Sequence, residues 1–265
     1  MRQFIFGVWV NVAWCVKISK GSNVVKFIAP EWYQQLSSTN SVLVERVRGG
    51  EVLPDGFVLA AHEQTAGRGR YSRVWAARPG RDLTFSFLLR GRMAFPQVVS
   101  LPLATALGVA SALEELGIEA QTKWPNDLLV QRKKICGILA ESCDEDALVV
   151  GVGLNINMDR DEADRIGQPA TSVAIETGEE YVVEEALGFL LPHIGAWIEC
   201  WQREGFAGLK EAWTQRCFNM GEYVQVGEGK GRKTGVLIGF GDAGQLLLRE
   251  DDGQQTEVWV GDVAF

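Results

Sequence analysis

The chain has 265 residues, a formal net charge of −8 at pH 7 and 46% hydrophobic residues. This length suits a large domain with a smaller one, and the composition is ordinary for a soluble globular protein. The acidic balance excludes the broad basic footprint that non-specific nucleic-acid binding requires. Five cysteines without a CxxC pair indicate reduced, packed thiols in a cytoplasmic protein, and two histidines are too few to favour a His/Cys zinc site.

The first 24 residues form an N-terminal extension of unclear order. Residues 4–16 are apolar apart from Asn11, but this run is too short to span a bilayer and no small-residue cleavage site follows it. We therefore expect an edge strand or a poorly packed extension here, and neither export nor membrane insertion.

A capped helix is predicted next. Residues 25–28 have strand character, and residues 31–36 lead into Ser-Ser-Thr-Asn at positions 37–40. Val42, Leu43 and Val47 then recur at helical spacing, so the hydroxyl side chains predict a helix N-cap. Two interpretations stay open for these hydroxyls: a cap alone, or a cap that also contacts a polar ligand.

A basic, glycine-rich loop leaves the buried strand predicted at residues 57–61. Residues 63–75 read Glu-Gln-Thr-Ala-Gly-Arg-Gly-Arg-Tyr-Ser-Arg-Val-Trp, and a half-buried strand follows at residues 83–89. Glycine lets a ligand approach the backbone, and arginine matches carboxylate and phosphate oxygens. The loop is either a solvated basic turn or a site for an anion. Because the whole chain is acidic, a local positive site favours a small anionic ligand over a polymer.

Helix and hairpin signals continue along the chain. A long helix is predicted at residues 98–116, with Ser100 and Pro102 at its start and Gly117 as its C-cap. Lys-Trp-Pro-Asn-Asp at residues 123–127 precedes a hairpin with strands at 128–130 and 134–141 and a tight turn at 132–134. A third strand, residues 147–152, leads into Gly-Leu-Asn; its Gly-Val-Gly is a weak dinucleotide fingerprint because the third glycine is missing.

The remaining chain reads as architecture. Helical patterns are predicted at residues 182–201 and 206–217, and His193 within the first is interpreted as a packed or surface histidine. Short strands at residues 223–226, 234–240, 245–248 and 257–260 alternate with Gly-Asp turns. These features predict a small barrel at the C-terminus.

Together these motifs resemble those of the biotin protein ligases. The matching stretches, in family order, are residues 38–40, Gln64 with 67–70 and 73–75, 123–127, Lys134 with 137–139, 151–155 and 171–172. Over roughly residues 25–265, the resemblance implies an α+β fold of the class II aminoacyl-tRNA synthetase-like type. Its catalytic domain, with a mixed, mainly antiparallel sheet, would occupy residues 25–219, and an SH3-like β-barrel residues 220–265. Tyr71-Ser72 depart from the Arg-Gly of many relatives, and residues 1–24 are too few for the winged-helix domain of repressor-type ligases.

The resemblance implies a two-step ligase reaction. ATP would activate biotin to biotinyl-5′-AMP, and the biotinyl group would pass to a lysine of the biotin carboxyl carrier protein of a carboxylase. Biotin and ATP are then substrates, Mg²⁺ neutralises the triphosphate, and neither DNA nor a membrane is a partner; a homodimer stays open. Because a carboxylate and a phosphate repel each other, fixed positive charge and orientation are the chief requirements. No covalent enzyme intermediate is needed.

Site residues follow from the same resemblance, and Arg70 and Lys123 are the predicted catalytic residues. The predicted biotin-binding residues are Ser38, Thr39, Asn40, Gln64, Gly67, Arg68, Gly69, Arg70, Lys123 and Gly137. The predicted ATP-binding residues are Arg68, Arg70, Arg73, Trp75, Lys123, Asn126, Lys134 and Asn155. No protein metal ligand is assigned: Asp127 either contacts Mg²⁺ or orients Lys123. Trp124 is either a pocket wall or a core residue, and the C-terminal domain either assists at the site or only stabilises the fold.

Two alternative functions stay open from the sequence. A lipoate ligase or octanoyltransferase has the same broad fold, although such enzymes lack the Gly-Arg-Gly-Arg loop. A non-catalytic regulator would bind biotin without releasing pyrophosphate.

Overall fold

The largest sheet of the protein is mixed and mainly antiparallel. The computed structural model describes residues 2–5, 8–11, 25–91, 95–227 and 231–264. Seven strands lie in the order β3 (Glu31–Leu36), β4 (Val58–Gln64), β5 (Leu83–Arg90), β9 (Ala147–Leu154), β8 (Lys133–Asp144), β7 (Asp127–Val130) and β6 (Gln121–Lys123). Only β3 and β4 pair in parallel among these neighbours. The predicted α+β class and sheet type are confirmed.

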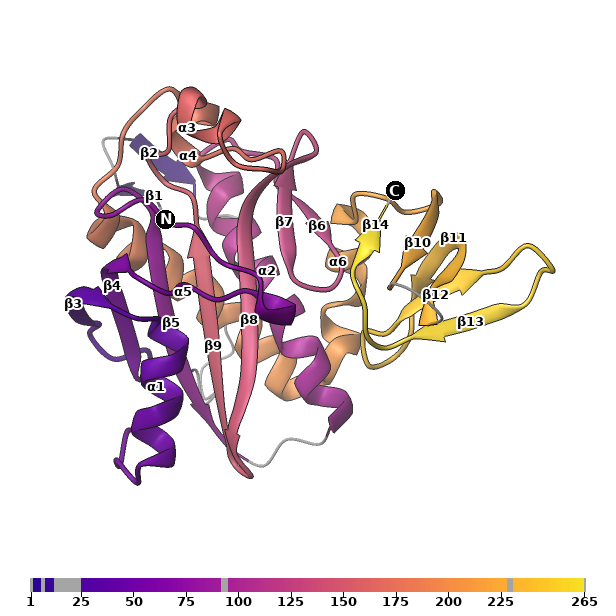
Figure 1. Cartoon of the computed structure of the whole chain (residues 1–265), viewed down its shortest axis with the longest axis horizontal. Helices are drawn as coiled ribbons and strands as arrows, with labels where there is room; N and C mark the ends of the chain where they lie inside the picture. Colours follow the sequence, from indigo (N-terminus) through magenta and orange to yellow (C-terminus); the bar gives the residue numbers. More distant parts are fainter. Residues whose placement is uncertain (1, 6–7, 12–24, 92–94, 228–230, 265) are drawn as a thin grey trace.

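Helices cover both faces of this sheet (Figure 1). The helices α2 (Phe95–Glu115) and α5 (Val183–Glu204) pack together in the main core, which includes Phe85 and Phe87 of β5. On the opposite face, α1 (Thr39–Arg48) packs through Leu43 against Leu88. Since side chains alternate along a strand, Thr84 and Ser86 share the α1 face with Leu88. Two small polar residues therefore stand where a packed core would need large apolar ones.

The C-terminal strands form a second, antiparallel sheet beside β6 and β7 (Figure 1). Its order is β13 (Gln255–Val258), β12 (Leu246–Arg249), β11 (Lys233–Phe240), β10 (Tyr223–Val226) and β14 (Val263–Ala264). Phe240 packs edge-on against Trp213 of α6 (Lys210–Arg216), with ring centroids 6.1 Å apart. The indole of Trp124 donates a 3.0 Å hydrogen bond to the carbonyl of Gly244. Trp124 is thus a buried core residue that fastens the two sheets together.

Several predicted boundaries are wrong. Residues 25–28 are not a strand: the N–H of Ile28 donates to the carbonyl of Gly56, but residues 25–30 form no strand ladder. Pro102 lies inside α2, which begins at Phe95, so Ser100 and Pro102 do not mark its start. Leu101 and Leu103 are fully buried on either side of the proline, so packing outweighs the lost backbone hydrogen bond.

Other corrections concern turns and the N-terminus. The hairpin between β7 and β8 turns at Gln131 and Arg132, with φ of 49° and 67°, and Lys133 already begins β8. The segment 206–217 divides into a 3₁₀ turn, η2 (Gly205–Gly208), and α6. The strands β1 (Arg2–Ile5) and β2 (Val8–Asn11) pair with each other as a separate two-stranded sheet, and not as an edge of the large one. Residues 12–24 of the predicted extension lie outside the described residues.

Burial in the interior explains two features of the composition. Among the described residues one segment, Val98–Glu115, is apolar and long enough to cross a membrane, but 67% of it is buried inside the fold as in a core helix. Cys136, Cys143, Cys200 and Cys217 are free and buried, as predicted, whereas Cys15 lies outside the described residues. Burial raises the pKa of the Cys217 thiol to about 11, which keeps it protonated and unreactive at neutral pH.

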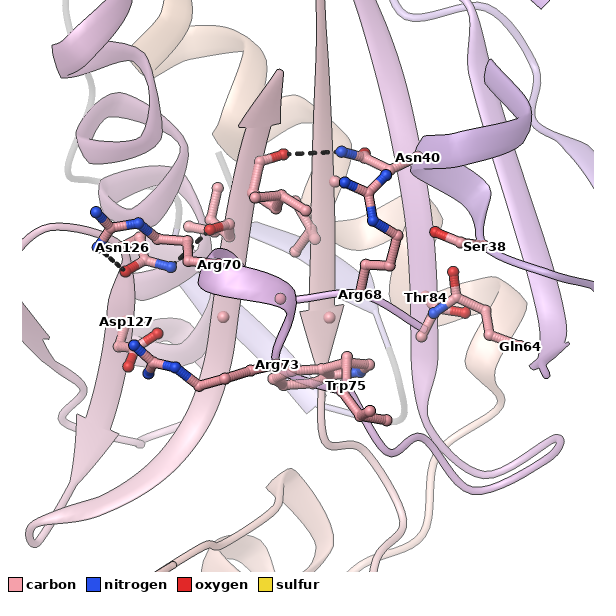
Figure 2. A pocket seen from close by; sticks show the side chains of 18 of the residues that line it. Ser38, Asn40, Gln64, Arg68, Arg70, Arg73, Trp75, Thr84, Asn126 and Asp127 are labelled. Atoms are coloured by element: carbon pink, nitrogen blue, oxygen red, sulfur yellow. Dashed lines mark hydrogen bonds between the residues drawn. The ribbon is translucent and has the colours of Figure 1, made fainter. Parts of the chain in front are cut away.

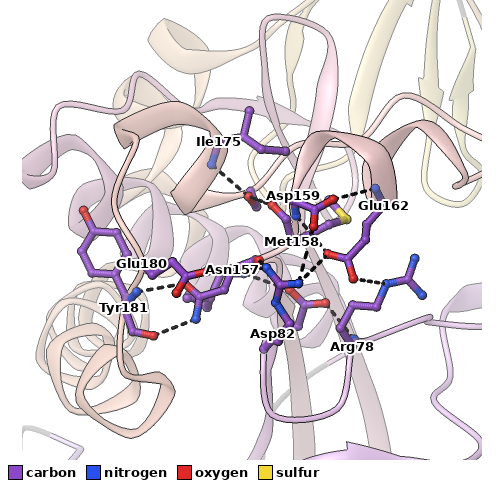
Figure 3. A network of polar contacts seen from close by, with 12 residues as sticks. Arg78, Asp82, Asn157, Met158, Asp159, Glu162, Ile175, Glu180 and Tyr181 are labelled. Carbon is purple, nitrogen blue, oxygen red and sulfur yellow. Dashed lines mark hydrogen bonds and ion pairs between the residues drawn. The ribbon is translucent and has the colours of Figure 1, made fainter.

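A polar network fixes the loop before β5 to the segment after β9 (Figure 3). The buried carboxylate of Asp82 accepts the backbone N–H groups of Arg78 and Ile156, at 2.8 and 3.1 Å. Asn157 both donates to the carbonyl and accepts from the N–H of Tyr181, at 2.7 and 2.9 Å. Burial raises the pKa of Asp82 to about 6, against the two backbone hydrogen bonds that lower it. The network holds the adjoining ends of the two central strands.

Candidate active site

A cavity of about 100 Å³ lies on the α1 face of the large sheet. The start of α1, the basic loop and the strands β5, β8 and β9 surround it (Figure 2). Asp262, in the segment before β14, also lines it. Its floor is made by residues with little or no side chain: Thr84, Gly137, Gly151 and Gly153. A cavity therefore remains on this face of the sheet, because these positions carry no large side chain that would fill it.

Most of the predicted site residues meet at this cavity. The residues that line it are Ser38, Thr39, Asn40, Gln64, Arg68, Gly69, Arg70, Arg73, Trp75, Asn126, Lys134 and Gly137. Three others do not line it. A Cβ on Gly67 would lie 2.4 Å from the carbonyl oxygen of Trp75, so this glycine lets the loop close on itself. Asn155 is buried and donates its amide hydrogens to the carbonyl groups of Thr171 and Lys134.

Lys123, the third of these, is half-buried at the end of β6. Burial lowers the pKa of its ammonium group; Lys134 and Arg73 act in the same direction, and Asp127 opposes them. Lys123 therefore interacts electrostatically with Asp127, Lys134 and Arg73, although it does not line the cavity.

One end of the cavity is neutral and polar. Ser38 caps α1, accepting the N–H of Ser41, and the N–H of Thr39 donates to Gln64 Oε1 at 2.7 Å. The Ser86 hydroxyl lies 2.8 Å from both Thr39 Oγ1 and Asn40 Oδ1. Hydroxyl, amide and helix N-terminal groups of this kind suit an uncharged, urea-like part of a ligand.

The other end is cationic. Arg70 Nη1 lies 2.6 Å from Asp262 Oδ1, and Arg73 pairs with the second oxygen of the same carboxylate. Tyr71 has φ of 53°, a left-handed conformation, and its ring lies 4.9 Å from the Arg70 guanidinium and 5.7 Å from that of Arg73. Burial lowers the pKa of Arg70, yet an arginine remains charged at neutral pH. Two guanidinium groups are thus held side by side around one anion.

Trp75 and Lys134 close the floor between these ends. A Cβ on Gly153 would lie 2.2 Å from Trp75 Cε2, and one on Gly137 would lie 2.9 Å from its Cζ3. Lys134 Nζ lies 5.5 Å from the Trp75 ring and 2.7 Å from Asp127 Oδ1. The buried Trp75 Nε1 has no hydrogen-bond partner among the described residues. Because Gly137 and Gly153 have no side chain, the Trp75 ring can pack directly against the backbone of β8 and β9.

Two carboxylates of the site were missed in the sequence. Glu141 Oε1 lies 2.7 Å from Arg68 Nη2, and Asp262 joins Arg70 to Arg73. Glu141 follows Gly137 and Leu139 with a period of two, and this alternation could have placed it on the cavity face. Asp262 carries no local signal, because only the docking of the C-terminal sheet brings it to the basic loop.

Comparison with known proteins gives consistent matches. Residues 32–159 match the Biotin/lipoate A/B protein ligase family. The chain is 34% identical to the biotin--[acetyl-CoA-carboxylase] ligase of Paracoccus denitrificans, over 83% of this chain and 95% of that protein. It is 31% identical to the bifunctional ligase/repressor BirA of Bacillus subtilis, over 84% and 70% respectively. The structure resembles a biotin protein ligase from Aquifex aeolicus in complex with biotin and ATP, with a TM-score of 0.79, 33% identity and coverage of 90% and 98%.

Proposed function

Because the chain belongs to the biotin protein ligase family, we infer that it activates biotin with ATP and transfers it to a lysine of a biotin carboxyl carrier protein. The observation that carries this inference is a cavity that has both a neutral polar end and a cationic end. Two relatives are named biotin--[acetyl-CoA-carboxylase] ligase, and this chain carries at residues 67–70 the Gly-Arg-Gly-Arg loop that we do not expect in a lipoate enzyme. Neither a lipoate ligase nor a non-catalytic, biotin-binding regulator is therefore favoured.

We propose that biotin lies along the cavity with its ureido group at the neutral end. Ser38, Thr39 and Gln64 supply donors and acceptors there, and the carboxylate points towards Arg70. The amide of Asn40 is already bonded to Leu139 O, Glu141 and Ser86, so its part is to shape the wall. This orientation places the one charged group of biotin at the cationic end.

In the first step a biotin carboxylate oxygen would attack the α-phosphorus of ATP. A mixed anhydride forms, the bond between the α- and β-phosphates breaks, and pyrophosphate leaves with the electron pair. Arg70, Arg73, Lys123 and Lys134 would offset the repulsion between the two anions. Removing one such donor from a water-poor site typically costs about 3–4 kcal/mol of transition-state stabilisation.

We expect Mg²⁺ to accompany the nucleotide. Among the described residues there is no group of three or more His, Cys, Asp and Glu side chains that could hold a metal. The cavity carboxylates, Asp127 and Asp262, are each engaged by a cation. Such a donor set fits an ion held mainly by phosphate oxygens and water, as Mg²⁺ often is.

In the second step the lysine amine of the carrier would attack the acyl carbonyl of the adenylate. The amide bond forms, the bond to the phosphate oxygen breaks and AMP leaves. Asp262, in the segment before β14, lines the cavity together with the basic loop, so we propose that the carrier approaches between this loop and the C-terminal sheet.

The organisation around this site is also proposed. Residues 25–219 would form the catalytic domain, preceded by an extension at 1–24, and the five C-terminal strands an SH3-like barrel that steadies the rim through Gly261 and Asp262. The acidic chain would bind no DNA, and its buried thiols suit the cytoplasm. A homodimer would form through the edge strand β3, which sedimentation at increasing concentration tests.

Purified protein with ATP, Mg²⁺ and either biotin or lipoate tests the function directly. We expect biotin-dependent pyrophosphate release, a biotinyl-adenylate in the mass spectrum and label on a carrier domain. Biotin binding without pyrophosphate would indicate a regulator, and a lipoyl-adenylate would indicate the lipoate enzyme.

A further inference from the structure

Glu141 does not line the cavity but contacts two residues that do. One oxygen of its carboxylate lies 2.7 Å from Arg68 Nη2, in the basic loop. The other accepts a 2.8 Å hydrogen bond from Asn40 Nδ2, in the first turn of α1. Its side chain is only 26% exposed. A single half-buried carboxylate thus fastens the loop to the helix that begins at the neutral end.

The contacts continue from Asn40 into the neutral end. Asn40 Nδ2 also faces the carbonyl of Leu139, whereas its Oδ1 faces the Ser86 hydroxyl at 2.8 Å, which fixes the orientation of the amide. Ser86 in turn lies 2.8 Å from Thr39 Oγ1, and Thr39 bonds to Gln64. A shift of Glu141 would therefore pass through Asn40 to the groups that face the ligand.

Arg68 is held on both sides by this arrangement. Its Nη2 pairs with Glu141 and its Nη1 donates to Ser41 Oγ at 3.0 Å. Both terminal nitrogens of Arg68 are thus engaged by side chains outside the basic loop. Its position suits a brace that keeps the glycine-rich loop closed over the neutral end.

We propose that Glu141 is a positioning residue of the ligation reaction: it holds Arg68 and Asn40 so that the loop closes over bound biotin. This rests on the proposed function, and it assigns to Arg68 a bracing role in place of direct contact with the α-phosphate. Arg70 and Arg73 keep their place at the cationic end.

The test compares Glu141→Gln with Asp144→Asn, an exposed carboxylate on the same strand. Since the pair is partly exposed, we expect the KM for biotin to rise about three- to tenfold in E141Q. The KM for ATP and kcat should stay within about twofold, because the cationic end is untouched. D144N should match the wild type. In an Arg68→Ala background E141Q should raise the KM for biotin by less than it does in the wild type, since only the contact with Asn40 is then left to lose.

A second readout needs no turnover. Loss of the pair should speed trypsin cleavage after Arg68 relative to cleavage after the exposed Arg132 in E141Q, and not in D144N. The proposal is overturned if a folded E141Q protein keeps the wild-type KM for biotin and the wild-type rate of trypsin cleavage after Arg68. It is also overturned if the KM for ATP rises as much as the KM for biotin, or if E141Q raises the KM for biotin in R68A as much as it does in the wild type. If E141Q fails to fold, Glu141→Asp, too short to reach both partners, takes its place. A wild-type chain that forms no adenylate overturns the proposed function instead, while the trypsin comparison still decides the role of Glu141.

Discussion

Arg70 and Asp262 are 192 residues apart in the chain, yet Arg70 Nη1 and Asp262 Oδ1 are 2.6 Å apart at the rim of the cavity. The same carboxylate pairs with Arg73, so one anion from the segment before β14 is shared by two cations of the basic loop. A nucleotide phosphate placed between these guanidinium groups would compete with Asp262. The C-terminal sheet therefore bears on the chemistry through charge as well as through packing.

Removing this internal anion should favour nucleotide binding. In Asp262→Asn the net charge of the three-residue cluster rises from +1 to +2, so we expect the KM for ATP to fall about threefold at low salt. Because the rim is partly exposed, the gain should shrink at high salt. Pyrophosphate exchange at two ionic strengths measures both effects. Asp242→Asn, in the exposed turn between β11 and β12, is the control, and a raised KM for ATP in D262N would contradict the competition.

Arg70 should also retain the intermediate. We expect Arg70→Gly to release biotinyl-adenylate before transfer, because the guanidinium that would hold the anionic anhydride is gone and the loop gains freedom. Mass spectrometry should then find biotin on lysines of a bystander protein. Arg232→Gly, at an exposed position, should label only the carrier. Carrier-only labelling by R70G would exclude this role for Arg70.

The packing of Trp75 against Gly153 gives a steric prediction. A methyl group on Gly153 would lie 2.2 Å from the Trp75 ring, so Gly153→Ala must displace the indole. We expect kcat/KM for ATP to fall about tenfold or more, equivalent to about 1.4 kcal/mol, with the fold retained. Steady-state pyrophosphate release measures the loss. Gly167→Ala, whose new methyl group meets nothing within 4 Å, should behave as the wild type. An unchanged kcat/KM for ATP in G153A would show that the reaction does not depend on the packing of Trp75 against Gly153.

Asp82 should make stability depend on pH. Burial raises its pKa from 3.8 to about 6, so the folded state binds this proton more tightly than the unfolded state. The contribution of this bound proton to the free energy of unfolding is complete below the pKa of the unfolded state, and it is lost as the pH rises through about 6. The loss amounts to at most about 3 kcal/mol. Denaturant unfolding at pH 4, 5, 6 and 7 measures the free energy of unfolding of the wild type and of Asp82→Asn. The wild-type value minus the D82N value should decline as the pH rises over this range. A constant difference would contradict it.

The sequence by itself determined the local elements and the chemical character of the site. Ser38 does cap α1, and Gly117, with φ of 79°, does end α2, because a cap depends on the few residues around it. The alternation of β5 likewise left small polar residues on one face. The basic loop lies between two adjacent strands, as its flanking apolar runs predicted.

Tertiary structure decided which of these groups meet. Lys123 and Asn155 belong to matching motifs but do not line the cavity, and Trp124 is buried between the two sheets. Glu141 and Asp262 reach the arginines only because β8 packs against the first turn of α1 and the C-terminal sheet docks beside β6 and β7. Caps and strand alternation depend on neighbours in the chain, whereas an ion pair across a cavity depends on how separate elements pack. Residue type and spacing therefore predicted the charges of the site, and packing alone selected their partners.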